Sequence, residues 1–138
     1  MGELKLQKTE LTAHDGTPVR LVYDEDADIL EIFFGKNGPA TGIELTNDMI
    51  LRLDRKAKRA LSLTLLHFSI LAEQTAYGPR SFLLDKLEQL PEDLHELVLR
   101  LITSLPVNQF LKLSHLQASP QKFMPFAYVE AQPMVAYA

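Results

Sequence analysis

Apolar and polar side chains alternate along the first half of the chain in short runs separated by turn residues. Residues 19–23 and 29–34 are rich in β-branched and aromatic side chains, and the acidic segment 24–28 lies between them. Alternation with a period of two is typical of half-buried strands. Aspartate favours a turn because its side chain can bond the backbone two residues on. The pattern therefore predicts a β-hairpin over residues 19–34.

The same pattern continues on both sides of this hairpin. Turn residues, mainly Gly, Pro, Asn and Asp, or charged residues separate the successive runs. Short strands with turns at this spacing are typical of an antiparallel meander. The first run is polar, and we expect it at an edge of the sheet. The expected strands cover residues 4–13, 18–23, 29–34, 41–46, 49–53 and 60–68.

Side chains alternate across a strand, so the residues sort onto two faces. The second face is mixed: it holds charged residues such as Arg20, Glu31 and Arg52, and also Val22, Ile29, Phe33, Ile50 and Leu66. It is too apolar to lie fully in water, so we expect a helix or a second subunit to cover part of it. The first face is apolar throughout and comprises Leu21, Tyr23, Leu30, Ile32, Phe34, Ile43, Leu45, Leu51, Leu53, Leu61, Leu63 and Leu65.

Beyond residue 70 the hydrophobic period becomes helical. Residues 82–90 fit a short amphipathic helix with Ser81 as its N-cap, and an apolar stripe over 94–105 predicts a second helix that begins at Pro91. Residues 107–116 fit either a helix or a strand. The tail from residue 118 contains three prolines and several aromatic residues. We expect it to form no single regular element and to pack on the protein's own helices or on a twofold partner.

These elements predict an α+β protein: an antiparallel β-meander of five to six strands, followed by two to three helices and an extended C-terminal tail. Residues 1–70 would form the meander module, and residues 71–138 a helical extension and tail that pack on the sheet. A chain of 138 residues is long enough for one such domain with a core of its own.

Composition excludes several classes of site. The chain has no cysteine, which rules out disulfides and thiolate zinc sites and suits a cytoplasmic location. The first eight residues lack an apolar run of signal-peptide length, and no segment approaches the roughly 18 apolar residues of a membrane span, so we expect no membrane association. The net charge of −4 disfavours nucleic acid as a partner.

The segment from Tyr23 to Ile32 resembles the hallmark of a small uncharacterised prokaryotic family, Tyr-Asp-x-x-Ala-Asp-x-Leu-x-Ile. The resemblance covers residues 19–70 and includes a final strand that leads to Ser69. Glu31 and Ala57 depart from the family pattern, which often has Tyr and Gly there. The resemblance implies a compact α+β meander module, and some members of the family look like partners of neighbouring toxin-like proteins.

The acidic turn holds the candidate metal ligands Asp24, Asp26 and Asp28. Carboxylates suit hard cations, but the spacing is not that of an EF-hand, and turn chemistry alone explains aspartate here. We therefore favour a solvated turn. His67 follows an apolar strand and could face a cleft beside Tyr23, so these two residues are the cleft candidates.

A basic cluster begins within the fifth expected strand and comprises Arg52, Arg55, Lys56, Lys58 and Arg59. It could contact phosphate, but a charged hairpin loop in an acidic protein accounts for it better. No Walker lysine, nucleophile elbow or dinucleotide fingerprint is present in the sequence.

We therefore expect a non-enzymatic protein-interaction module that self-associates as a homodimer and uses no cofactor. One alternative is a small metal-dependent enzyme, such as a hydrolase, that uses the acidic turn at residues 24–28. The other is an antitoxin-like partner that occludes a toxin.

Overall fold

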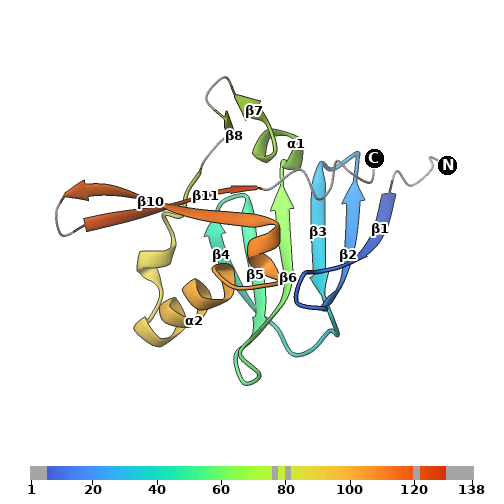
Figure 1. The fold of residues 1–138 in the computed structure, drawn as a ribbon, viewed down its shortest axis with the longest axis horizontal. Helices are drawn as coiled ribbons and strands as arrows, with labels where there is room; N and C mark the ends of the chain where they lie inside the picture. Colours follow the sequence, from blue (N-terminus) through green and yellow to red (C-terminus); the bar gives the residue numbers. More distant parts are fainter. Residues whose placement is uncertain (1–5, 76–77, 80–81, 120–121, 130–138) are drawn as a thin grey trace.

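A six-stranded antiparallel sheet organises the protein (Figure 1). In the computed structural model, which describes residues 6–75, 78–79, 82–119 and 122–129, all six expected strands are present, with ends shifted by at most two residues. The strands are β1 (Leu6–Thr12), β2 (Pro18–Asp24), β3 (Ile29–Phe34), β4 (Thr41–Thr46), β5 (Met49–Asp54) and β6 (Arg59–Leu66).

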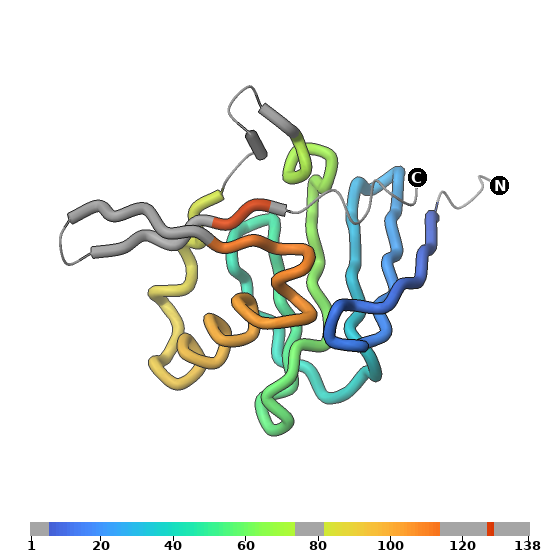
Figure 2. Tube along the Cα trace, viewed as in Figure 1, coloured from blue at the N-terminus to red at the C-terminus, as the bar shows by residue number. Residues whose placement is uncertain are grey.

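The strand order is β1-β2-β3-β6-β5-β4, so the meander consists of two three-strand units rather than one continuous run. Residues 35–40 carry the chain past the ends of the strands, from β3 at the centre to β4 at the far edge (Figure 2). Arg59 holds this crossing in place: its guanidinium donates to the carbonyl oxygens of Phe34 at 3.0 Å and Lys36 at 2.6 Å. Thus β6, the last strand of the second unit, holds the connection between the two units in place.

A second layer covers one face of the sheet. Helix α2 (Glu92–Ile102) and strand β10 (Leu111–Ser119) pass in front of it in Figure 1. Strand β10 pairs with β11 (Lys122–Val129), which pairs with the short β9 (Phe82–Leu83). The smaller elements are α1 (Phe68–Leu71), β7 (Gln74–Thr75), β8 (Gly78–Pro79), and the 3-10 turns η1 (Leu87–Gln89) and η2 (Val107–Gln109).

The helix expected over 91–105 is confirmed as α2, with Pro91 as the residue that flanks its start. The helix expected over 82–90 is wrong: Phe82 and Leu83 pair with β11, and only η1 is helical. A long-range strand partner, which local periodicity cannot reveal, overrides the helical pattern. The proposed cap, Ser81, lies outside the described residues. Within the part of the chain that the structure describes, α-helices are therefore fewer than expected: the long helix α2 and the single turn α1.

The segments left ambiguous or irregular by the sequence form a hairpin. Residues 107–116 begin as η2 and continue as β10. The tail does form a regular element, β11, contrary to expectation. Proline is tolerated at Pro125 because β9 pairs only with Phe126 and Ala127 of this strand. Ala127 is fully buried in the core, so this part of the tail packs on the protein itself. Residues 130–138 lie outside the described part of the chain.

The core lies between the first face of the sheet and this second layer. Leu30 is 3% exposed, and Ile32, Leu51 and Leu63 are fully buried, as expected. Ile32 pairs with Leu63, which in turn pairs with Leu51 on the next strand. From the second layer, Phe110 brings its ring to 6.1 Å from that of Phe34.

One residue of the predicted apolar face points the other way. The register of β5 with β6 shifts between Arg52 and Leu53, so that Leu53 pairs with Ala60 instead of Leu61. An extra residue in one strand is a β-bulge, and it breaks the strict alternation of side chains. Ala60 therefore joins the core, whereas Leu61 lines a hollow on the second face.

Truncating a core residue should test this packing directly. Leu30→Ala is expected to lower the free energy of unfolding by about 2–5 kcal/mol, because it leaves a cavity beneath the second layer. Urea denaturation measures the loss. As the matched control, Leu6→Ala at a position 39% exposed should change stability by less than about 0.5 kcal/mol. Equal effects of the two substitutions would contradict the assigned core.

Candidate functional site

Asp28 lies in the β2–β3 turn and hydrogen-bonds to strand β2 and to helix α1. Its Oδ1 accepts a hydrogen bond from the Tyr23 hydroxyl at 2.7 Å and from the Ser69 backbone N–H at 3.0 Å. Its Oδ2 accepts from the Ser69 hydroxyl at 2.6 Å. The backbone carbonyl of Asp28 also accepts from the N–H of Phe68 at 3.0 Å. We call Tyr23, Asp28 and Ser69 the aspartate clamp.

Local backbone geometry explains why aspartate occupies this position. Asp28 has a positive φ of 56°, a left-handed conformation that Asp and Asn adopt more readily than most residues. At the other end of the turn, the Asp24 carboxylate accepts from the N–H of Ala27 at 3.1 Å. The acidic segment is thus a turn stabilised by its own aspartates, in agreement with the preferred interpretation of the sequence.

The clamp shifts the pKa of both partners in the directions that strengthen it. Partial burial opposes ionisation of Asp28, but hydrogen bonds from Ser69 and Tyr23 outweigh this effect, so the pKa of Asp28 lies below its ordinary value. The same bond to Asp28, together with burial and the neighbouring carboxylates, raises the pKa of Tyr23 to about 12. At neutral pH the pair is therefore a carboxylate and a neutral phenol.

Of the two cleft candidates from the sequence, Tyr23 belongs to the clamp and bonds to Asp28, whereas His67 bonds to Asp48. Among the described residues, no hydrogen bond joins Tyr23 to His67. His67 also has a positive φ of 54°, and its Nδ1 lies 2.9 Å from the Asp48 carboxylate. The Tyr23 ring contacts Phe68 edge-to-face, with centroids 5.6 Å apart. Sequence reasoning did not identify Asp48 or the partnership of Ser69 with Asp28. The Ser that ends the family-like segment was the available signal for the latter.

The chemistry open to this arrangement is limited. The Ser69 hydroxyl donates to the Asp28 carboxylate, and the lowered pKa of that carboxyl makes it a weak base for activating a serine. The carboxylate oxygens of Asp24 and Asp28 accept hydrogen bonds from other groups of the chain, and the Asp26 side chain is exposed. In the described ranges, no group of three or more His, Asp or Glu side chains is placed to hold a metal ion.

The basic cluster is divided among separate roles. Arg59 binds backbone carbonyls, and the Arg55 guanidinium lies 3.9 Å from the Asp93 carboxylate of α2. The Asp54 carboxylate accepts from the N–H groups of Lys56 and Ala57, which shapes the hairpin turn. These contacts agree with the interpretation of the cluster as a charged hairpin loop.

The second face of the sheet carries an apolar band. Among the described elements outside the sheet, the long ones lie across the opposite face (Figure 1). The band residues are each half-buried, and none belongs to the core or is packed against it. Ile29 and Leu66 pair at the ends of β3 and β6, and Glu31 and Thr64 lie between them and the row of Phe33. The members of this apolar band are Val22, Ile29, Phe33, Ile50 and Leu66.

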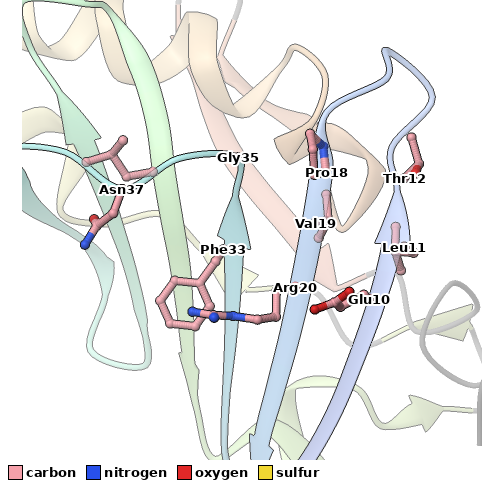
Figure 3. A pocket seen from close by; sticks show the side chains of 10 residues that line it. Glu10, Leu11, Thr12, Pro18, Val19, Arg20, Phe33, Gly35 and Asn37 are labelled. Carbon is pink, nitrogen blue, oxygen red and sulfur yellow. The ribbon is translucent and has the colours of Figure 1, made fainter.

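One end of the second face is hollowed. Figure 3 shows the Arg20 side chain lying across the Phe33 ring, with Glu10 on the neighbouring strand. The Arg20 guanidinium carbon is 4.6 Å from the ring centroid, a cation–π contact. The open groove has a volume of about 600 Å³ and is also lined by Asn37 and Leu61. The groove therefore exposes both apolar and charged side chains.

Within the described ranges, no helix has the length and apolar character needed to cross a bilayer. Comparison with known proteins found no matching family model, curated protein or solved structure. The family resemblance of residues 19–70 therefore stays a prediction.

Neutralising the clamp should cost stability in a pH-dependent manner. Asp28→Asn keeps a residue that tolerates positive φ but removes the charge, so we expect a loss on the order of 1 kcal/mol near neutral pH. Because the pKa of Asp28 is lowered by folding, its contribution is present above the ordinary value of 3.8 and is lost as the pH falls through the folded value. Denaturation at several pH values should show the two proteins converge in acid. Glu25→Gln on the same turn is the control and should change little at any pH.

Tyr23, the tyrosine of the clamp, should ionise at a higher pH than an ordinary tyrosine. In a spectrophotometric titration of phenolate absorbance, the wild-type protein should show one step at pH about 12 that Tyr23→Phe lacks. A raised pKa in the folded state means that the stabilising contribution is present below the unfolded value and is lost as the pH rises through about 12. Tyr128→Phe is the control, because it removes a phenol and leaves the bond to Asp28 in place. A late step that survives in Tyr23→Phe would contradict the assignment.

Proposed function

We propose that the protein is a non-enzymatic interaction module that self-associates as a homodimer through the second face of its sheet. The observation that carries this proposal is the apolar band, five half-buried apolar side chains on a face that the long elements of the second layer leave open. Exposed contiguous apolar surface on a folded domain marks a site of interaction. Twofold dimers are the commonest assembly of soluble proteins.

The contacts of the acidic turn favour this function over a metal-dependent enzyme. The carboxylates of Asp24 and Asp28 each accept hydrogen bonds from the chain, and those bonds hold the hairpin and the start of α1. A cation bound there would have to replace these bonds. The absence of cysteine suits a soluble protein of the cytoplasm, where we place it.

The apolar band also carries charges of both signs around it. Lys8, Arg20 and Arg52 share the face with Glu10, Asp24, Glu31 and Glu44, so the charges of the face nearly balance. A surface that is apolar at its centre and balanced in charge can contact a copy of itself without net repulsion. This balance supports a second copy of the chain as the partner.

A charge in the middle of the apolar band should prevent self-association. We expect sedimentation velocity at micromolar concentrations to show a dimer for the wild-type protein and a monomer for Phe33→Asp, because a buried unpaired carboxylate is costly at an interface. Leu105→Asp is the matched control: Leu105 is 41% exposed, follows α2, and should leave the dimer intact. Thermal melts verify that each variant is folded. A wild-type protein that stays monomeric at high concentration would refute the proposed function.

A further inference from the structure

Strand β1 forms one edge of the six-stranded sheet and lacks most of the features that normally close an edge (Figure 1). Its seven residues contain no proline or glycine, and its register with β2 is unbroken. Within the described ranges, no strand pairs with its outer side. The opposite edge, β4, contains Gly42 and a register shift between Glu44 and Thr46. Because bulges weaken pairing and a regular free edge is a template for another strand, β1 is the edge better suited to accept one.

The hairpin that joins β1 to β2 fixes which backbone groups of β1 point outward. The Ala13 N–H donates to the Thr17 carbonyl at 2.8 Å, so these two residues form a hydrogen-bonded pair. The next pair, Thr12 with Pro18, is not hydrogen-bonded: Pro18 has no N–H, and its carbonyl accepts from the Gly35 N–H at 2.8 Å, on the side of β3. Because the two kinds of pair alternate, every second residue of β1 directs its N–H and C=O away from β2. These residues, all exposed, are Leu6, Lys8, Glu10 and Thr12.

The charges of β1 select one register for an antiparallel copy of the same strand. A twofold axis perpendicular to the sheet places one residue opposite its own copy, and the residues on either side of it then face each other. Centred on Thr9, the pairing includes all seven residues, and Lys8 faces Glu10 of the other copy on both sides of the axis. Centred on Lys8 or on Glu10, it includes only residues 6–10 or 8–12, and like charges meet. Length and charge therefore favour the same register.

The surroundings of these residues agree with the register centred on Thr9. Within its own sheet Glu10 faces Arg20 and Lys8 faces Val22, so the added strand places no like charges side by side. Thr9 meets its own copy in a non-hydrogen-bonded pair, where threonine side chains are close enough to interact. Charged residues on an edge normally prevent pairing. Here they oppose the shifted registers and permit the longest one.

We infer that a second copy of this chain adds to the edge of the sheet, β1 against β1, in the antiparallel register centred on Thr9. This contact uses the edge of the sheet and does not rest on the proposed dimer through the second face. The axis perpendicular to the sheet leaves the second faces of both copies on the same side, so both contacts can form in one assembly. A single pair of short strands is a small interface, and we expect it to form at concentrations on the order of 100 μM.

Disulfide formation tests the register. Because the chain has no cysteine, each introduced cysteine is unique. Thr9→Cys should join two copies on incubation with oxidised glutathione, since the Cα atoms of a non-hydrogen-bonded pair lie about 4.5 Å apart, within disulfide range. Gln7→Cys is the matched control: it is on the same strand and face and is more exposed, but it faces Leu11 of the other copy. It therefore lies roughly 13 Å from its own copy, four residues along the strand.

Non-reducing gels at about 100 μM protein measure the rate of joining. Thr9→Cys should form the linked dimer on the order of tenfold faster than Gln7→Cys, because the register brings only the former pair into contact. Equal rates would show random collision and would overturn the inference. Faster joining of Gln7→Cys would overturn it as well, because that result places the axis elsewhere.

Complementary charge variants test the same contact by a second route. They are made in the Phe33→Asp protein, in which the contact through the second face is removed. Lys8→Glu places carboxylates opposite each other across the axis, and Glu10→Lys places ammonium groups there, so each should associate on the order of tenfold more weakly than Phe33→Asp alone. An equimolar mixture should recover the association, because every pair then joins opposite charges. Sedimentation equilibrium measures the masses, and thermal melts verify that each variant is folded.

The two contacts between copies fail separately. If folded Phe33→Asp stays monomeric at about 100 μM while the wild-type protein dimerises, the edge contact is overturned and the proposed function stands. If Phe33→Asp associates as tightly as the wild-type protein, the proposed function fails and the edge contact stands. An association that neither Lys8→Glu nor Glu10→Lys weakens also overturns the inference, because the register centred on Thr9 requires both charges.

Discussion

The pairing of β3 with β6 is the constraint on which the rest of the structure depends. It unites two three-strand units into one sheet, and its register places Leu30 opposite Leu65 and Ile32 opposite Leu63. Because side chains alternate, a slip of one residue in this pairing would turn the core residues of one unit to the opposite face. The same register aligns β6 so that its end meets the β2–β3 turn.

The aspartate clamp secures the end of this central pair. Asp28 precedes β3, and Ser69 lies just beyond β6 in α1, so their hydrogen bonds join the two units where the strands end. At the other end of the same strands, Arg59 at the start of β6 binds the carbonyl oxygen of Phe34, the last residue of β3. Both ends of the central pairing are therefore held by charge-assisted hydrogen bonds, which are stronger than neutral ones. A structural role of this kind explains the acidic turn without any ligand.

The two faces of the sheet have different relations to the rest of the chain. The first face is covered by α2 and the β10–β11 hairpin, whose buried residues include Val98, Ile102 and Phe110. The second face keeps its apolar band half-buried and surrounds it with charges of both signs. A face that was fully apolar would aggregate, and a fully polar one would stay in water. A mixture of this kind is what the self-association proposed above requires.

Local sequence pattern determined the six strands, the helix α2 and most of the core residues on the sheet, because periods of two and 3.6 residues depend only on neighbours along the chain. Turn chemistry likewise identified the acidic segment as a turn. The tertiary structure alone decided the strand order, since nothing local to β4 indicates whether it pairs with β3 or with β5 only. It also decided the strand state of Phe82 and Leu83, which depends on β11 about forty residues away, the bulge that turns Leu61 outward, and the meeting of Asp28 with Ser69. Each of these features is a contact between distant segments, and its energy is absent from any single stretch of the chain.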